Sequence, residues 1–156
     1  IVAMAHPDGM SSLLSGSVEC HLTTSPYVYK EAAEEGIHEV EALESVWPDG
    51  NSFILMMAST DLYENDPELY QAVLSALEEA ITWINENKEE AAEMLCEAED
   101  VDAATMLEWL NDPACVYSTE TKGVMDMANF MAENDFLENE GPSSMSDLAF
   151  DNVVGN

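Results

Sequence analysis

The sequence predicts an α/β protein in which a strand-rich N-terminal part precedes a helical layer. Three observations support this fold class. Apolar stretches of strand length alternate with helix-start signals over the first third of the 156 residues. The run "FILMMA" is continuously apolar, as are strands that a sheet buries on both faces. From Asp61 onward, apolar residues recur at helical spacing instead.

Four segments are expected as strands. The chain opens with "IVAMA", and "VECHLT" follows the first helix signal. A third segment alternates as I-H-E-V-E-A-L, which is typical of a strand with one wet face. The apolar run comes after a turn-rich connector, "WPDGNS", so the break between the two parts falls near Asp49–Ser52. The four expected strands are residues 1–5, 18–23, 37–43 and 53–59.

Helix signals separate these expected strands. Pro7 and Asp8 form a helix start, and Gly16 suits the C-terminus of that helix. Pro26 fits the first turn of a second helix, which runs to about Glu34.

The region after residue 60 is predicted to be mostly helical. Its longest helix covers Pro67–Asn85, because Asp66 is an N-cap residue and the apolar side chains that follow share one stripe. Further helices are expected at about 88–96, 102–110 and 122–133, with a short turn near 146–150. The stripe consists of Leu69, Val73, Leu77, Ile81 and Ile84.

The charge of the chain excludes two classes of partner. There are 33 acidic and 3 basic residues, which gives a net charge of -30, and the basic residues are all lysines. No basic patch can be built to neutralise phosphates, so nucleic-acid binding is excluded. An anionic membrane surface would repel the chain, and the longest apolar run is too short to cross a bilayer. Adaptation to high salt, which screens self-repulsion, is one hypothesis for this acidity.

Two loops before helix starts are candidates for a binding site. His6 follows the first expected strand, and Ser25-Pro26-Tyr27 follows the second. In a parallel sheet these positions would share one rim, where ligands bind. Hydroxyl groups, helix N-terminal N–H groups and an aromatic ring suit a neutral or anionic small ligand. The predicted ligand-binding residues are His6, Asp8, Thr24, Ser25, Pro26 and Tyr27.

Other interpretations of these residue types stay open. Pro26 and Tyr27 can equally well start and pack a helix, and His21 and His38 are most simply structural residues with satisfied hydrogen bonds. Lys30 is the one cation near the loops, at a helical position that can face solvent. The sequence has no spaced metal-ligand set, so we expect no metal and no cofactor. A disulfide between Cys96 and Cys115 is an open alternative in an oxidising compartment.

Several segments together resemble a known family. "PDGMSSLLSGSVECHLTTSPYVYKE", "GIHEV", "DLYENDPELYQAVLSALEEAITWINENKEEAAEML", "WLNDP" and "KGVMDMANFM" follow one another in the order found in extracytoplasmic substrate-binding proteins of ABC importers. The chain resembles the nitrate/sulfonate/taurine type in particular, which is related to thiamine-pyrimidine precursor binders. Glu19-Cys20 stands where the family usually has Asp-Ala, and this chain has no Arg to clamp an anion.

The resemblance implies a type II periplasmic-binding-protein fold, in which two α/β lobes close around a ligand. The opening "IVAMAHPDGM" starts directly in an expected strand, so we expect the chain to be the C-terminal portion of such a protein. Residues 1–50 would then be the last part of the distal ligand-binding lobe. Residues 51–156 would be a hinge strand and the helical part of the first lobe.

The resemblance further implies a solute-binding component of an ABC importer, without catalysis. Its partners would be a small organic solute (sulfonate, nitrate-like or pyrimidine-like) held in an interlobe cleft, and an ABC permease in the membrane. Its location would be the periplasm or the cell surface, reached by secretion or a lipid anchor. Two alternatives are an enzyme related to thiamine pyrimidine synthesis, with His6 or His21 in its chemistry, and a folding fragment without function.

Overall fold

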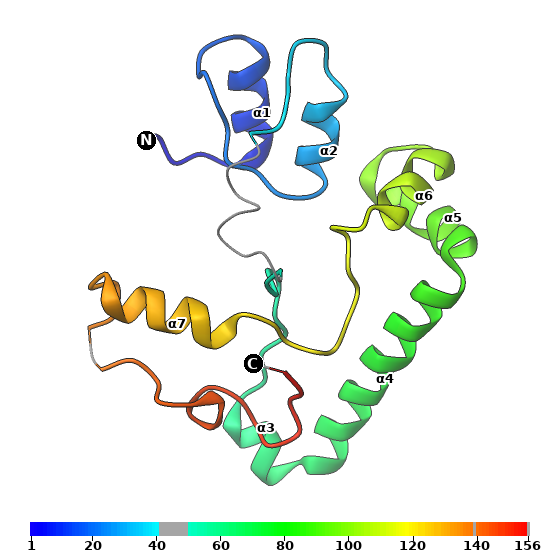
Figure 1. Cartoon of the computed structure of the whole chain (residues 1–156). Coiled ribbons are helices and arrows are strands. Elements are labelled where there is room, and N and C mark those ends of the chain that lie inside the picture. Colours follow the sequence, from blue (N-terminus) through cyan, green and yellow to red (C-terminus); the bar gives the residue numbers. More distant parts are fainter. Residues whose placement is uncertain (41–49, 139, 156) are drawn as a thin grey trace.

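The computed structural model describes residues 1–40, 50–138 and 140–155, and the described residues are mainly helical (Figure 1). Helices α1 and α2 lie side by side at the N-terminal end, and the long α4 leads from α3 to the pair α5–α6. Helix α7 follows, and the C-terminal segment returns toward α3. The helices are α1 (His6–Leu14), α2 (Tyr27–Ala32), α3 (Thr60–Asn65), α4 (Pro67–Glu86), α5 (Lys88–Glu99), α6 (Ala103–Asn111), α7 (Val124–Glu133) and the 3-10 turn η2 (Met145–Asp147).

The predicted helices are confirmed, and side-chain N-caps explain where two of them, α4 and α6, begin. The Asp66 carboxylate accepts a hydrogen bond from the Leu69 N–H at 3.2 Å, and Pro67 occupies the first turn of α4. The Asp102 carboxylate accepts from the Thr105 N–H at 2.8 Å at the start of α6. Each cap satisfies one of the N–H groups that a helix terminus leaves unpaired.

The predicted strands are wrong, and with them the α/β fold class and the type II periplasmic-binding-protein architecture. Among the described residues, no strand forms at 1–5, 18–23, 37–40 or 53–59, while 41–43 lie outside them. The apolar run is exposed, with Ile54 at 87% and Met57 at 91% of their full accessible surface. A strand exists only when a neighbouring strand pairs with its backbone. These segments lack such a partner within the described part of the chain.

One small patch of extended backbone does pair. The Thr121 N–H donates to the Val154 carbonyl at 2.8 Å, next to an isolated parallel bridge between Thr121 and Gly155. On the other side, the Ser52 N–H donates to the Lys122 carbonyl at 2.9 Å. Three segments distant in sequence therefore meet here.

The best-packed contact in the described chain is between α5 and α6. Ala91 and Ala92 on α5 are fully buried against Met106 and Leu110 on α6, and the indole of Trp109 packs at the edge. Two adjacent alanines let the helices approach closely, and the larger side chains of α6 fill the space. The Lys88 ammonium also donates to the Leu110 carbonyl at 2.7 Å, which satisfies one of the free carbonyls at the end of α6.

The C-terminal segment is attached to α3 and α4 by aromatic rings. Phe150 stacks on Tyr63 of α3 at 4.1 Å between ring centroids, and Tyr70 of α4 meets both rings edge-on. The Tyr70 hydroxyl donates to the Asn152 side-chain oxygen at 2.9 Å. A shallow pocket of about 220 Å³ lies in the C-terminal segment itself, lined by Met145, Ser146, Ala149, Phe150, Asp151 and Val153.

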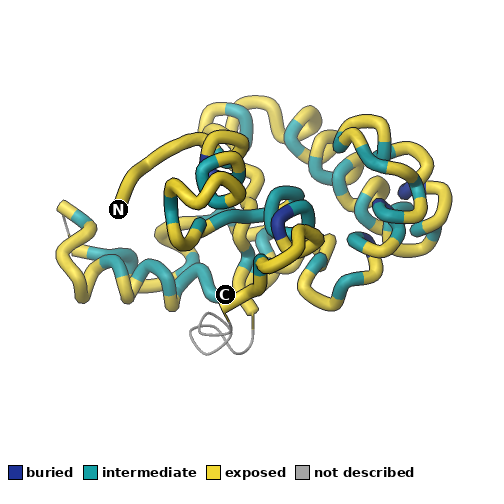
Figure 2. The backbone as a smooth tube through the Cα atoms, turned by 90° about the horizontal axis from the view of Figure 1, so that it is seen from above, coloured by how far each residue is buried: buried dark blue, intermediate teal, exposed yellow. Residues whose placement is uncertain are grey.

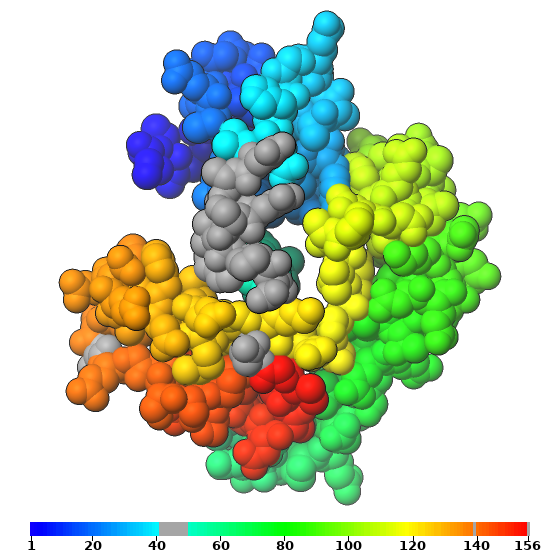
Figure 3. Space-filling model, viewed as in Figure 1, coloured from blue at the N-terminus to red at the C-terminus, as the bar shows by residue number. Residues whose placement is uncertain are grey.

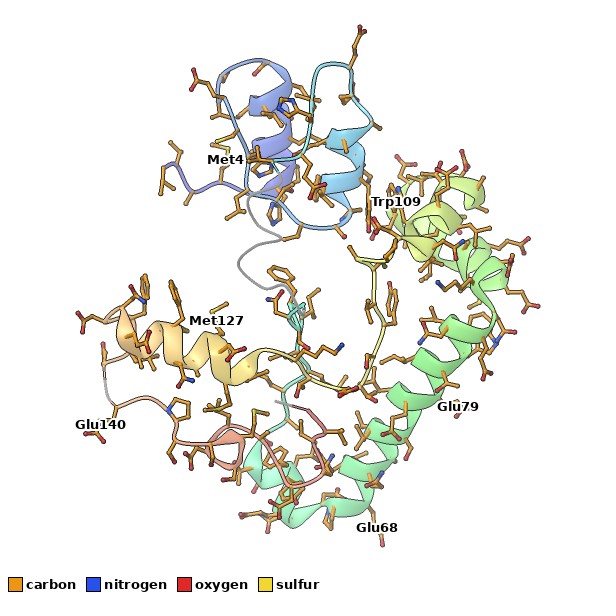
Figure 4. All side chains as sticks on the ribbon, in the orientation of Figure 1. Met4, Glu68, Glu79, Trp109, Met127 and Glu140 are labelled. Carbon is orange, nitrogen blue, oxygen red and sulfur yellow. The ribbon has the colours of Figure 1, made fainter. Side chains whose placement is uncertain are left out.

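Helix α4 is covered only in part: Tyr70 contacts Phe150, and Trp83 and Ile84 pack against the α5–α6 core. None of its 20 residues is buried, and Leu69 and Val73 of the predicted apolar stripe are exposed. Figure 4 shows Glu68 and Glu79 on this helix projecting away from the body of the protein. The stripe is therefore exposed at its N-terminal end, whereas Leu77, Ile81 and Ile84 at its C-terminal end are half-buried.

The burial pattern agrees with an open arrangement of helices. Figure 2 shows a few buried positions separated by exposed chain. The accessible surface is 11756 Å², about half again the ~7,800 Å² expected for a compact monomer of 17.1 kDa. No helix among the described residues has both the length and the apolar character that spanning a membrane requires. The division at residue 50 stays a prediction, because residues 41–49 are outside the described ranges.

Candidate functional site

The two predicted loops meet where α1 packs beside α2. Helix α1 begins at His6, after Ala5 in extended conformation, and Pro7 occupies the first turn. Helix α2 begins at Tyr27, directly after Pro26. Proline suits a helix start, because its backbone angle is already helical and it has no N–H to leave unpaired. Pro7 and Pro26 therefore place the rings of His6 and Tyr27 at the N-termini of α1 and α2.

His6 and Tyr27 are brought together by this packing. Their rings stack with centroids 5.7 Å apart and planes inclined by 27°. The His6 Nδ1 lies 3.5 Å from the Thr23 hydroxyl oxygen, and the His21 ring is tilted against the His6 ring at 5.6 Å. The result is three rings and one hydroxyl at the N-terminal ends of two helices.

A buried acid–imidazole pair lies behind these rings. The His21 Nδ1 and a Glu31 carboxylate oxygen are 2.7 Å apart, and their side chains are only 10% and 5% exposed. The other edge of the His21 ring lies against Gly9 of α1, where an added Cβ would be 2.6 Å from the ring Cε1. Gly9 is buried, and only a glycine leaves room for the ring there. We call His6, Gly9, His21, Thr23, Tyr27 and Glu31 the histidine cluster.

The Lys30 side chain lies beside the histidine cluster and contacts other residues there. Its ammonium donates to the Glu99 carbonyl at the end of α5 at 2.9 Å and lies 5.8 Å from the centre of the Tyr27 ring. The ion pair recorded among the described residues is that of His21 with Glu31, so no carboxylate there pairs with Lys30. Lys30 therefore places a positive charge beside the cluster.

Tyr29, the residue before Lys30 on α2, connects the histidine cluster to α6. Tyr29 stacks on Trp109 of α6, and the Asp112 carboxylate acts on its hydroxyl. Burial and then this carboxylate raise the pKa of Tyr29 to about 12. Figure 3 shows the N-terminal helices, in blue, against the yellow-green surface of α6, and Figure 4 marks Trp109 at this contact.

The other predicted site residues have more peripheral positions. Asp8 is exposed in the first turn of α1. Thr24 is half-buried and its hydroxyl donates to the Ser25 carbonyl at a long 3.4 Å. Ser25 is exposed, and Pro26 is half-buried. These residues shape the entry to α2, whereas His6 and Tyr27 supply the ring surfaces.

The interpretation of His21 as a structural residue with a satisfied hydrogen bond agrees with its contact to Glu31, whereas sequence reasoning missed Gly9, Thr23 and Glu31. Helical spacing could have found two of them. Glu31 lies four residues after Tyr27 and Gly9 three after His6, so each shares a helix face with a predicted site residue. Thr23 carried no such signal, because it lies in the loop.

The chemistry available at the cluster is that of binding. Aromatic faces, a hydroxyl and a nearby ammonium can hold a small planar molecule. No group of three or more His, Cys, Asp or Glu within the described ranges is arranged to hold a metal ion. Cys96 and Cys115, the open disulfide candidates, are both free thiols.

Comparison with known proteins places the chain in a family context. The family model described as "NMT1-like family" matches residues 1–98, which include the whole histidine cluster. No curated protein and no solved structure matches the chain.

Proposed function

Because the chain belongs to the NMT1-like family, the family of nitrate/sulfonate/taurine-type ABC substrate-binding proteins, we propose that it captures a small organic solute and delivers it to an ABC permease. The family points to an extracytoplasmic solute-binding role, and its members are generally binding proteins, not enzymes. The observation that carries the proposal is the meeting of His6 and Tyr27 at the ends of two helices within the matched region. Secretion or a lipid anchor would bring the protein to the periplasm or cell surface.

The composition of the cluster favours a pyrimidine-like solute over an inorganic anion. The stacked rings suit a heteroaromatic solute. The Thr23 hydroxyl and the imidazoles can form hydrogen bonds with the polar edge of such a ring. A net charge of -30 repels anions at long range, and Lys30 is the one lysine beside the cluster. A neutral ring therefore meets less resistance here than nitrate or a sulfonate.

The geometry of His21 gives the enzymatic alternative no support. A general base needs a ring nitrogen that can reach a substrate proton. The Nδ1 of His21 contacts Glu31, and the Nε2 edge lies against the backbone of Gly9. His21 thus serves packing within the site.

Isothermal titration in molar KCl tests the proposal, with cytosine, taurine and nitrate as probes. We expect heat of binding with cytosine, and its loss in His6→Ala and Tyr27→Ala. His38→Ala is the matched control, because His38 is an exposed histidine outside the cluster. Absence of binding heat with all three probes, in a protein that melts cooperatively, would overturn the proposed solute class. A protein that neither binds a probe nor melts cooperatively would favour the folding-fragment alternative.

A further inference from the structure

We propose that Glu31 is a positioning residue, which acts through His21 to hold His6 against Tyr27 in the site. This inference rests on the proposed function for its ligand readout, whereas its structural readout is independent of any ligand. Glu31 itself does not contact the ring face on which a solute would stack. Its effect on binding would therefore come through the placement of the two imidazoles.

The first step is that Glu31 needs His21. Glu31 is 4% exposed and is the one buried polar or charged residue recorded in the described ranges. A buried carboxylate is costly unless a hydrogen-bonded partner offsets its lost hydration. The partner that the structure provides is the His21 Nδ1 at 2.7 Å, the separation typical of a strong, charge-assisted hydrogen bond.

The second step is that His21 is held from two sides. Glu31 fixes one edge of the ring from α2, and Gly9 receives the other edge on α1, where a Cβ would lie 2.8 Å from the ring Cδ2. The ring therefore acts as a spacer between the two helices. Its position determines how closely α1 can approach α2 at this level.

The third step leads from His21 to the solute-binding surface. The His21 and His6 centroids are 5.6 Å apart, and the His6 and Tyr27 centroids are 5.7 Å apart. Tyr27 and Glu31 are one turn apart on α2, so the same helix face carries both the ring and the acid that aligns it. If Glu31 releases His21, His6 loses one of the two rings that pack against it.

Two substitutions of Glu31 distinguish the effect of its charge from the effect of its hydrogen bond to His21. Glu31→Gln keeps the size and an acceptor oxygen, and Glu31→Ala removes the hydrogen bond. We expect cytosine affinity to fall about tenfold in Glu31→Ala, because His6 would no longer be held against Tyr27, and to fall less in Glu31→Gln. Glu34→Gln is the matched control, because Glu34 is an exposed acid just beyond α2 and should leave the affinity unchanged.

The readout that a merely structural role would not move is the histidine side-chain NMR spectrum. In Glu31→Ala we expect the ring signals of His21 and His6 to shift together, while those of the exposed His38 stay in place. Thermal melts of each variant establish that it is folded. In Glu31→Gln, which disturbs packing least, the same two signals should move by a smaller amount.

Two results would overturn the proposal. One is a Glu31→Ala protein in which His21 shifts and His6 does not, because the coupling between the rings would then be absent. The other is a joint shift of both rings with cytosine affinity unchanged. If the unaltered protein binds none of the probes, the proposed function fails by itself, and the NMR spectra still decide whether Glu31 positions His6.

Discussion

Tyr29 of α2 stacks on Trp109 of α6 with ring centroids 5.2 Å apart and planes inclined by only 17°. The two residues are 80 positions apart in the chain, counted as 109 minus 29. With the Lys30 ammonium on the Glu99 carbonyl, this contact attaches the N-terminal helices to the best-packed part of the protein. The candidate site is thereby joined to α5–α6 through α2.

The Tyr29 contact predicts an unusual alkaline titration. Burial and the Asp112 carboxylate disfavour the tyrosinate, so the pKa is raised from 10.0 to about 12. The folded state thus binds the phenolic proton more tightly than the unfolded chain. The stability that this provides is complete below pH 10 and is lost as the pH rises toward 12. Ultraviolet absorbance should show this phenol titrating late.

A single substitution identifies the residue responsible. Tyr29→Phe keeps the stack on Trp109 and should remove one late-titrating phenol. Tyr117, whose pKa burial also raises, contributes a second late phenol that should remain in this variant. An absorbance titration of Tyr29→Phe that superimposes on the unaltered protein at the alkaline end would contradict the assignment.

The N-cap of α6 predicts a loss of stability in acid. Hydrogen bonds from Thr105 lower the pKa of Asp102 below 3.8, so the carboxylate stabilises the folded state above that pH. The contribution is lost as the pH falls through the lowered pKa of the folded state. Asp102→Ala should lower the melting temperature by a few degrees at neutral pH. Asp102→Asn should retain most of the cap, because an amide oxygen also accepts the bond, but the part of the acid dependence that Asp102 contributes should disappear.

The α5–α6 core predicts a large difference between two methionines. Met106 is buried against α5, whereas Met94 on α5 is 71% exposed. Met106→Ala should cost about 2–5 kcal/mol in the free energy of unfolding, because it removes buried methylenes and leaves a cavity. Met94→Ala should change it by less than about 0.5 kcal/mol. Urea unfolding followed by circular dichroism measures both, and equal effects would show that this contact is not the core.

The charge predicts stabilisation by salt. A net charge of -30 on 156 residues repels itself, and at about 0.1 M ionic strength charges interact over roughly 10 Å. In molar KCl that range falls to about 3 Å, so the melting temperature should rise. Thermal melts at low and molar KCl test this, and an identical melting temperature at both would argue against the high-salt hypothesis.

Helices were predictable from the sequence because their signals are local. Asp66 and Pro67 define the start of α4 through bonds within four residues, and Asp102 does the same for α6. The strands were not predictable in this way. An apolar run such as 53–58 specifies that burial would be favourable, but a strand also requires a partner backbone, which local sequence does not reveal.

The candidate site was likewise predictable only where its signals are local. Sequence alone determined that His6 and Tyr27 stand at helix starts, because proline placement acts on its own turn. Tertiary structure alone decided that the two rings meet and that Lys30 turns toward Glu99. It also decided that His21 fills the space over Gly9 and bonds Glu31. These contacts join residues of different elements, and the packing of α1 on α2 creates them.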